Sequence, residues 1–183
     1  GSRAARSAAH VLNSHRSANP EVKPLRLHEI SGKAIPRMDL HDDELNRVLG
    51  GGLVQGSIIL LGGEPGIGKS TLTLQTILKM PDRRILYVSG EESAYQLKMR
   101  AERLQSQSFP AWETDEGTAA FDHLLVLCET SLEAIFGHIK DTKPDLVVID
   151  SIQAIATEEV ESSAGSISQV RECAASLLRL AKS

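Results

Sequence analysis

The sequence predicts an α/β fold of three layers, in which helices cover both faces of a mainly parallel β-sheet. Apolar runs of four residues recur along the chain, and segments with helical spacing separate them. Strands that alternate with helices need crossover connections, which are right-handed and align the strands in parallel. The runs contain no alternating polar positions, as is typical of strands that are buried on both faces of a sheet.

The composition agrees with one folded domain and an N-terminal arm. The chain has 183 residues, of which 41% are hydrophobic and 24% are charged, as in ordinary globular proteins. No apolar run approaches the ~20 residues that cross a bilayer, so a transmembrane span is excluded. Cys128 and Cys173 form no C-x-x-C pair, which argues against a zinc site or a disulfide framework. We therefore expect a cytoplasmic protein whose two thiols are small buried apolar groups.

The first 37 residues differ in charge from the rest. Residues 1–37 hold seven Lys and Arg against two Glu, a balance of +5, so the remainder carries −9 if the total is −4. This part is rich in Ala and Ser and lacks a sustained periodicity, which favours a linker or arm. Gly1 and Ser2 are interpreted as a cloning remnant, and an organelle transit peptide is the alternative for this Arg- and Ser-rich start. The folded domain is expected over residues 38–183.

The early elements of this domain are bounded by glycine and proline. Residues 42–49 have helical spacing, and the glycines at 50–52 supply a stop. The run Ile-Ile-Leu-Leu at 58–61 lies between glycines and suits a strand that is buried on both faces. The helix expected at 70–80 ends before Pro81, which cannot continue it.

The later elements repeat this alternation of strand and helix. A charged helix is expected at 93–104, and the stretch 105–122, which contains proline and glycine, is an irregular insert. Ser168 is the expected N-cap of the last helix. The other elements expected from apolar runs and helical spacing are strands at 85–88, 124–127 and 146–149 and helices at 131–141 and 168–181.

The most informative motif is Gly63-Glu64-Pro65-Gly66-Ile67-Gly68-Lys69-Ser70, which matches G-x-x-x-x-G-K-[ST] in full. Phosphate oxygens are bound by several backbone N–H groups at a helix N-terminus, so the loop must curl tightly, and glycine permits the dihedrals. Lys69 adds a charge for the β- and γ-phosphates of ATP, or the β-phosphate of ADP, and the Ser70 hydroxyl is a candidate Mg²⁺ ligand. These residues and Thr71 are the predicted nucleotide site, with Lys69 also catalytic. A chance glycine-rich turn is the alternative.

Asp150 closes the fourth expected strand after four apolar residues. A carboxylate at the C-terminal tip of a buried parallel strand lies where open α/β sheets bind ligands. Asp150 is therefore predicted to hold the water shell of Mg²⁺ as the second half of the metal site with Ser70. The alternative is an N-cap or an ordinary loop carboxylate.

Two glutamates, Glu91 and Glu92, follow the second expected strand. A carboxylate at this place is suited to orient and deprotonate the water that attacks a γ-phosphate. Both residues equally suit the start of a helix, where negative charge is favoured. Glu91 lies nearer to the strand end and is the preferred catalytic residue, although spacing alone does not decide between the two.

Six further segments occur in an order that one family shows. They are Arg-Val-Leu-Gly-Gly-Gly-Leu-Val-Gln-Gly-Ser at 47–57, Tyr-Val-Ser-Gly-Glu-Glu-Ser at 87–93, Lys-x-Arg-Ala-x-Arg-Leu at 98–104, Cys-Glu-Thr-Ser at 128–131, Asp-Ser-Ile-Gln at 150–153 and Gly-Ser-Ile-Ser-Gln-Val-Arg-Glu at 165–172. With the phosphate loop, they resemble the RecA-like P-loop NTPase core of the bacterial RadA (Sms) family over about residues 27–183. In this resemblance the water-activating glutamate of the family corresponds to Glu91.

The resemblance implies a DNA-dependent ATPase of recombination and DNA repair that uses ATP/ADP and Mg²⁺. The implied partners are single-stranded DNA, branched recombination intermediates, further copies in a hexameric helicase-like ring, and a RecA recombinase. It also implies that the core is truncated at its C-terminal side, so we expect weak activity of the fragment. The alternatives are a replicative-helicase-like or clock-type ring ATPase, a nucleotide-switched scaffold and a small-molecule kinase.

Residues 153–167 correspond to the first DNA-facing loop in this resemblance. The loop contains three Glu, no Lys or Arg and no aromatic residue, whereas phosphates are bound mainly through basic groups and bases through stacking. A mobile solvated loop is therefore an equal alternative. Lys98, Arg100 and Arg103 are expected on a solvated helix face, with an adenine or subunit contact as the alternative.

Overall fold

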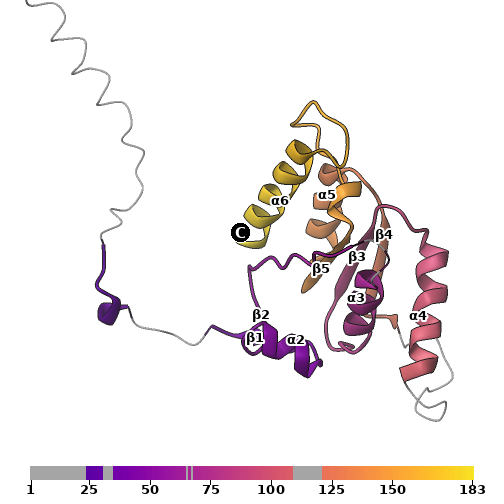
Figure 1. Ribbon diagram of the computed structural model, residues 1–183, viewed down its shortest axis with the longest axis horizontal. Coiled ribbons are helices and arrows are strands. Elements are labelled where there is room, and N and C mark those ends of the chain that lie inside the picture. The colour runs from indigo at the N-terminus through magenta and orange to yellow at the C-terminus, as the bar shows by residue number, and fades with distance from the viewer. Residues whose placement is uncertain (1–23, 31–34, 65, 67, 109–120) are drawn as a thin grey trace, which may run out of the picture. The chain divides into compact units, whose positions relative to one another are not determined.

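A computed structural model describes residues 24–30, 35–64, 66, 68–108 and 121–183. The chain divides into two compact units, Gly1–Ile35 and Pro36–Ser183, and each is described by itself. The described part of the first unit holds a short 3₁₀ helix, η1 (Leu27–Glu29). The second unit holds the other helices and strands that the structure describes (Figure 1).

The central sheet of the second unit has three parallel strands in the order β4-β3-β5. The strand β3 (Ile85–Ser89) lies between β4 (Leu124–Cys128) and β5 (Leu146–Asp150). The register pairs Ser89 with the last residue of each neighbouring strand, so the carboxyl ends of all three strands meet at one edge. All residues of β3 are buried, which explains why its sequence shows an apolar run rather than alternation.

Helices cover both faces of this sheet, which confirms the predicted three-layer α/β fold (Figure 1). The covering helices are α3 (Lys69–Leu78), α4 (Ala94–Ser108), α5 (Leu132–Thr142) and α6 (Ile167–Ala181). Ile85 and Tyr87 pack with α3 and α4, whereas Leu86 and Val88 pack with α5 and α6. This division follows from the two-residue period of a strand. None of the helices in the described ranges has the length and apolar character that a membrane crossing needs.

A small antiparallel pair of strands precedes the main sheet, and no sequence pattern predicted it. β1 (Arg37–Met38) pairs with β2 (Leu53–Val54), and the helix α2 (Asp43–Val48), which was predicted, lies between them in the chain. Gly52 has a φ of +117°, and a Cβ built there would lie 2.5 Å from the carbonyl oxygen of Met38. Glycine therefore permits the close approach of the two strands.

The prediction of a buried strand at Ile58–Leu61 is wrong. These residues belong to no strand of the described sheet, and their side chains are between 42% and 79% exposed. An extended apolar segment becomes a strand only where a neighbouring strand pairs with its backbone N–H and C=O groups. In the part of the chain that the structure describes, neither β4 nor β5 pairs with this segment.

Two further boundaries differ from the sequence prediction. The helix α4 continues to Ser108, so the start of the insert predicted at 105–122 is helical, and residues 109–120 lie outside the described residues. The helix α6 is capped by Ser166 rather than by Ser168, because the Ser166 side chain accepts a hydrogen bond from a backbone N–H of the first turn.

The two thiols lie in different environments. Cys173 is buried between α6 and the loop after β5, as predicted, and burial raises the pKa of its thiol. Cys128 is exposed, so the prediction of burial is wrong for this residue. Cys128 is the last residue of β4. This strand lies at the edge of the described sheet and pairs only with β3.

Candidate functional site

The phosphate loop leads directly into the N-terminus of α3. Gly66 and Gly68 have φ values of +83° and +89°, and Gly68 is the N-cap of the helix. No neighbouring atom lies within 4 Å of a Cβ built on either glycine. The left-handed backbone conformation, rather than crowding, therefore explains both glycines. Pro65 and Ile67 of the predicted site lie outside the described residues.

The Lys69 ammonium group lies across this loop. Its Nζ donates hydrogen bonds to the carbonyl oxygens of Gly63 at 2.7 Å and Glu64 at 2.8 Å. Ser70 and Thr71 follow in the first turn of α3, and both are half-buried. The loop thus combines the N–H groups of a helix N-terminus with one cation and two hydroxyl groups, which is a chemistry suited to a phosphate and its metal ion.

The carboxylate of Asp150 is held from the neighbouring strand. The Tyr87 hydroxyl donates a hydrogen bond to Oδ2 of Asp150 at 2.5 Å. Tyr87 is almost fully buried, and this burial, followed by the hydrogen bond to Asp150, raises the pKa of the Tyr87 hydroxyl far above its ordinary value. A carboxylate oxygen and the Ser70 hydroxyl are both hard oxygen donors, so this donor set fits Mg²⁺.

The turn after β3 brings both glutamates next to the end of β5. The N–H of Gly90 donates to the carbonyl oxygen of Asp150 at 3.1 Å. The Ser89 hydroxyl accepts from the N–H of Glu92 at 3.0 Å and donates to its carbonyl oxygen at 2.8 Å. These bonds fix the backbone of the turn, while the side chain of Glu91 between them is exposed.

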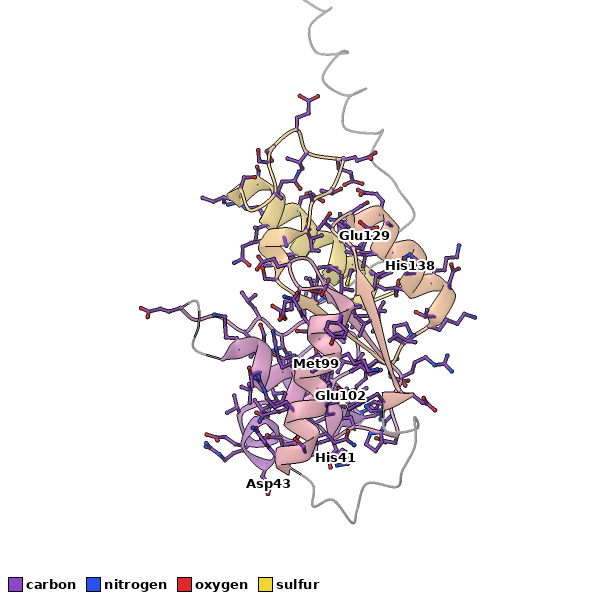
Figure 2. All side chains as sticks on the ribbon, turned by 90° about the vertical axis from the view of Figure 1, so that its right-hand side faces the viewer. His41, Asp43, Met99, Glu102, Glu129 and His138 are labelled. Carbon is purple, nitrogen blue, oxygen red and sulfur yellow. The ribbon has the colours of Figure 1, made fainter. Side chains whose placement is uncertain are left out.

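Glu92 forms an ion pair with Arg100 of α4, and the two side chains are 30% and 18% exposed. The prediction of a solvated face is therefore wrong for Arg100. It is confirmed for Lys98, which is exposed and pairs with Glu102. Figure 2 shows Glu102 on the outward face of α4. Because the Glu92 carboxylate is already engaged, Glu91 is the exposed carboxylate of the turn. This agrees with the preference for Glu91, whose catalytic role stays a prediction.

The structure does not join the two halves of the predicted site. Asp150 and the turn carrying Glu91 are bonded to each other, but no hydrogen bond or ion pair of the described residues connects Asp150 to the phosphate loop. The loop follows Ile58–Leu61, which pairs with no strand of the described sheet. The sheet therefore fixes Asp150 and Glu91, while the phosphate loop is positioned by α3.

Sequence reasoning missed Gln169, which organises the loop after β5. Its side chain is 1% exposed. Its Oε1 accepts from the N–H of Thr157 at 3.0 Å, and its Nε2 donates to the carbonyl oxygens of Thr157 at 3.0 Å, Val160 at 2.8 Å and Ser162 at 3.0 Å. The sequence signal that could have identified Gln169 is the spacing Ser166-x-x-Gln169, which is a capping-box pattern. The start of this loop is thus packed rather than solvated.

Tyr87 and Arg100 were missed for another reason. Tyr87 and its partner carboxylate are 63 positions apart, and Arg100 and Glu92 are eight apart. Eight positions exceed the three or four that make neighbours on one helix. No local signal exists for either contact, because both depend on which elements are neighbours in space.

The comparisons with known proteins agree with the fold. Residues 37–183 match the family described as AAA domain. This match covers most of the chain, so the chain belongs to the AAA domain family. Within this class, the chain is similar to bacterial proteins named DNA repair protein RadA, which confirms the resemblance drawn from the sequence.

Three of these relatives show the extent of the similarity. The chain is 50% identical over 156 residues to the RadA protein of Listeria monocytogenes, which covers 84% of this chain and 31% of that protein. It is 47% identical over 163 residues to that of Halalkalibacterium halodurans, with 88% and 33% covered. For Pseudomonas aeruginosa the identity is 48% over 157 residues, with 85% and 32% covered. The chain thus spans about a third of the length of these curated relatives.

Proposed function

We propose that this chain is the nucleotide-binding core of a DNA repair ATPase of the RadA type. The phosphate loop carries the proposal. Its two left-handed glycines turn the backbone into the N-terminus of α3, and the Lys69 ammonium group lies across the loop. A helix N-terminus with such a loop attracts a phosphate through its N–H groups and its partial positive charge. Membership in the AAA domain family supports the same ligand, ATP or ADP.

The residues of the chain have separate roles in this proposal. The N–H groups of the 63–70 loop bind the phosphates, and Lys69 neutralises the charge of the β- and γ-phosphates. Ser70 and Asp150 would hold Mg²⁺, which when bound supplies positive charge to the phosphate oxygens. Glu91 orients the attacking water and takes its proton. The ion pair of Glu92 with Arg100 keeps the neighbouring carboxylate out of this reaction.

The proposal for the whole protein goes further. We place this core in a hexameric, helicase-like ring that acts on single-stranded and branched DNA together with a RecA recombinase. The support is the name of the relatives and the resemblance of the motifs. The loop after β5 adds no support of its own, because residues 153–167 contain three glutamates and no basic side chain.

Nucleotide binding is tested by calorimetry with ADP and Mg²⁺. Lys69→Ala is expected to weaken ADP binding about 10- to 150-fold, because a hydrogen bond to a charged group contributes about 1.5–3 kcal/mol. Lys98→Ala is the matched control, since Lys98 is exposed on α4 and bonds to Glu102 rather than to the loop. Equal affinity of the wild-type chain and Lys69→Ala would contradict the assignment. Stimulation of ATP turnover by single-stranded DNA separates the DNA motor from a kinase or a scaffold.

A further inference from the structure

Tyr87 and Asp150 meet because of the register of two neighbouring strands. Tyr87 pairs with Val148 and Ser89 pairs with Asp150, so the two side chains are diagonal neighbours on β3 and β5. Asp150 therefore lies two residues further along the strand direction than Tyr87, an offset of about 6–7 Å that only a long side chain spans. Tyrosine spans it and donates its hydroxyl proton to Asp150 Oδ2 at 2.5 Å. Phenylalanine has the same shape without the donor.

The position of the Tyr87 hydroxyl is fixed by packing. Tyr87 is 1% exposed, and its ring belongs to the core that contains Leu74 of α3 and Leu97 and Ala101 of α4. The neighbouring side chains therefore hold the ring in place, because buried side chains are close-packed in low-energy rotamers. The hydrogen bond from the Tyr87 hydroxyl therefore fixes the position of Oδ2 of Asp150. Its other oxygen remains able to accept a further donor.

We propose that Tyr87 is the positioning residue of the metal-side carboxylate: its hydroxyl fixes one oxygen of Asp150 so that the other faces the shell of Mg²⁺. This inference rests on the proposed function, because it takes Asp150 as part of the metal site. The hydroxyl acts through Asp150 and touches neither nucleotide nor metal. Partners that orient a ligand in this way typically change metal affinity or activity 10- to 100-fold when they are removed.

The test compares Tyr87→Phe with Tyr95→Phe. Tyr95 is 71% exposed at the start of α4, so the same change there leaves the metal site untouched. For each protein, ADP affinity is measured by calorimetry over a series of Mg²⁺ concentrations and in EDTA. Mg²⁺ is expected to increase the ADP affinity of the wild-type chain. We expect Tyr87→Phe to need about tenfold more Mg²⁺ to reach half of this increase. The ADP affinity of Tyr87→Phe in EDTA is expected to stay within about twofold of the wild-type value. The ADP affinity of Tyr95→Phe is expected to stay within the same range.

A second measurement needs no nucleotide. In the unliganded chain, the ¹³C resonance of the Asp150 carboxyl group is expected to shift or broaden in Tyr87→Phe and to stay in place in Tyr95→Phe. An unchanged resonance together with an unchanged Mg²⁺ dependence would overturn the inference. A Tyr87→Phe chain that does not fold would also overturn it, because the hydroxyl would then act in stability.

The two proposals fail in different ways. If the wild-type chain binds ADP equally well in EDTA and in Mg²⁺, the positioning role of Tyr87 is overturned while the phosphate loop keeps its assignment. If the wild-type chain binds no ADP under any condition, the proposed function fails, and the Asp150 resonance alone then decides whether Tyr87 fixes that carboxylate.

Discussion

Replacing Gln169 by leucine is expected to destabilise the loop after β5 by a large amount. The change keeps a similar side-chain volume but removes one acceptor and the donors that reach three carbonyl oxygens. The bonds to the N–H and C=O of Thr157 are fully buried. A buried polar group left without a partner costs about 1–3 kcal/mol, so these two groups together cost about 2–6 kcal/mol. The carbonyls of Val160 and Ser162 are partly open to water and add little.

This cost is measurable, because the free energy of unfolding of a native domain is about 5–15 kcal/mol. In a domain of this size, each kcal/mol lowers the melting temperature by about 2–4 °C. We therefore expect Gln169→Leu to melt at least about 4 °C below the wild type in circular dichroism. Hydrogen exchange at the amides of residues 155–162 should accelerate even if the loop opens without global unfolding.

Gln107→Leu is the matched control for this experiment. Gln107 is exposed on α4, so the same replacement there removes no buried hydrogen bond. If Gln169→Leu and Gln107→Leu melt at the same temperature and exchange the 155–162 amides at the same rate, the organising role of Gln169 is refuted.

Two further predictions concern the turn after β3. Glu91→Gln is expected to keep ADP affinity and to lose ATP turnover, whereas Glu92→Gln should mainly reduce stability by breaking the pair with Arg100; turnover lost only in Glu92→Gln would exchange the two roles. Gly90→Ala is expected to destabilise the fold by about 1–3 kcal/mol in urea denaturation, because a Cβ there would lie 2.3 Å from that of Ala154. Gly62→Ala is its control, since nothing lies within 4 Å of a Cβ at Gly62, and equal stability of both variants would show that the turn relaxes freely.

Much of the fold could be read from local patterns. Each strand of the described sheet appears in the sequence as an apolar run, and in the central strand β3 burial on both faces leaves no place for polar alternation. The edge strands β4 and β5 have the same pattern but are only partly buried. The run at 58–61 has the same composition and yet forms no strand in the described structure. An apolar composition shows that a segment can be buried. Whether the segment forms a strand depends on a partner strand elsewhere in the chain.

The chemistry of the phosphate loop is likewise a local property. Its glycines, Lys69 and Ser70 are consecutive, so the positive φ values and the contact of Lys69 with the loop carbonyls arise within eight residues. Patterns that join residues three or four positions apart predicted less of the structure. The capping-box spacing of Ser166 and Gln169 predicts a helix start, but it does not reveal that the Gln169 amide bonds three carbonyl oxygens of the preceding loop.

The sequence by itself determined the helices, the three strands of the described sheet and the glycine-rich loop with Lys69, because each of these depends on neighbours in the chain. Only the tertiary structure decided that Tyr87 holds Asp150, that Arg100 engages Glu92, and that β3 lies between β4 and β5. Strand order and register are set by packing between segments that are distant in sequence. One register step would turn the Tyr87 hydroxyl to the other face of the sheet, and no local pattern records that choice.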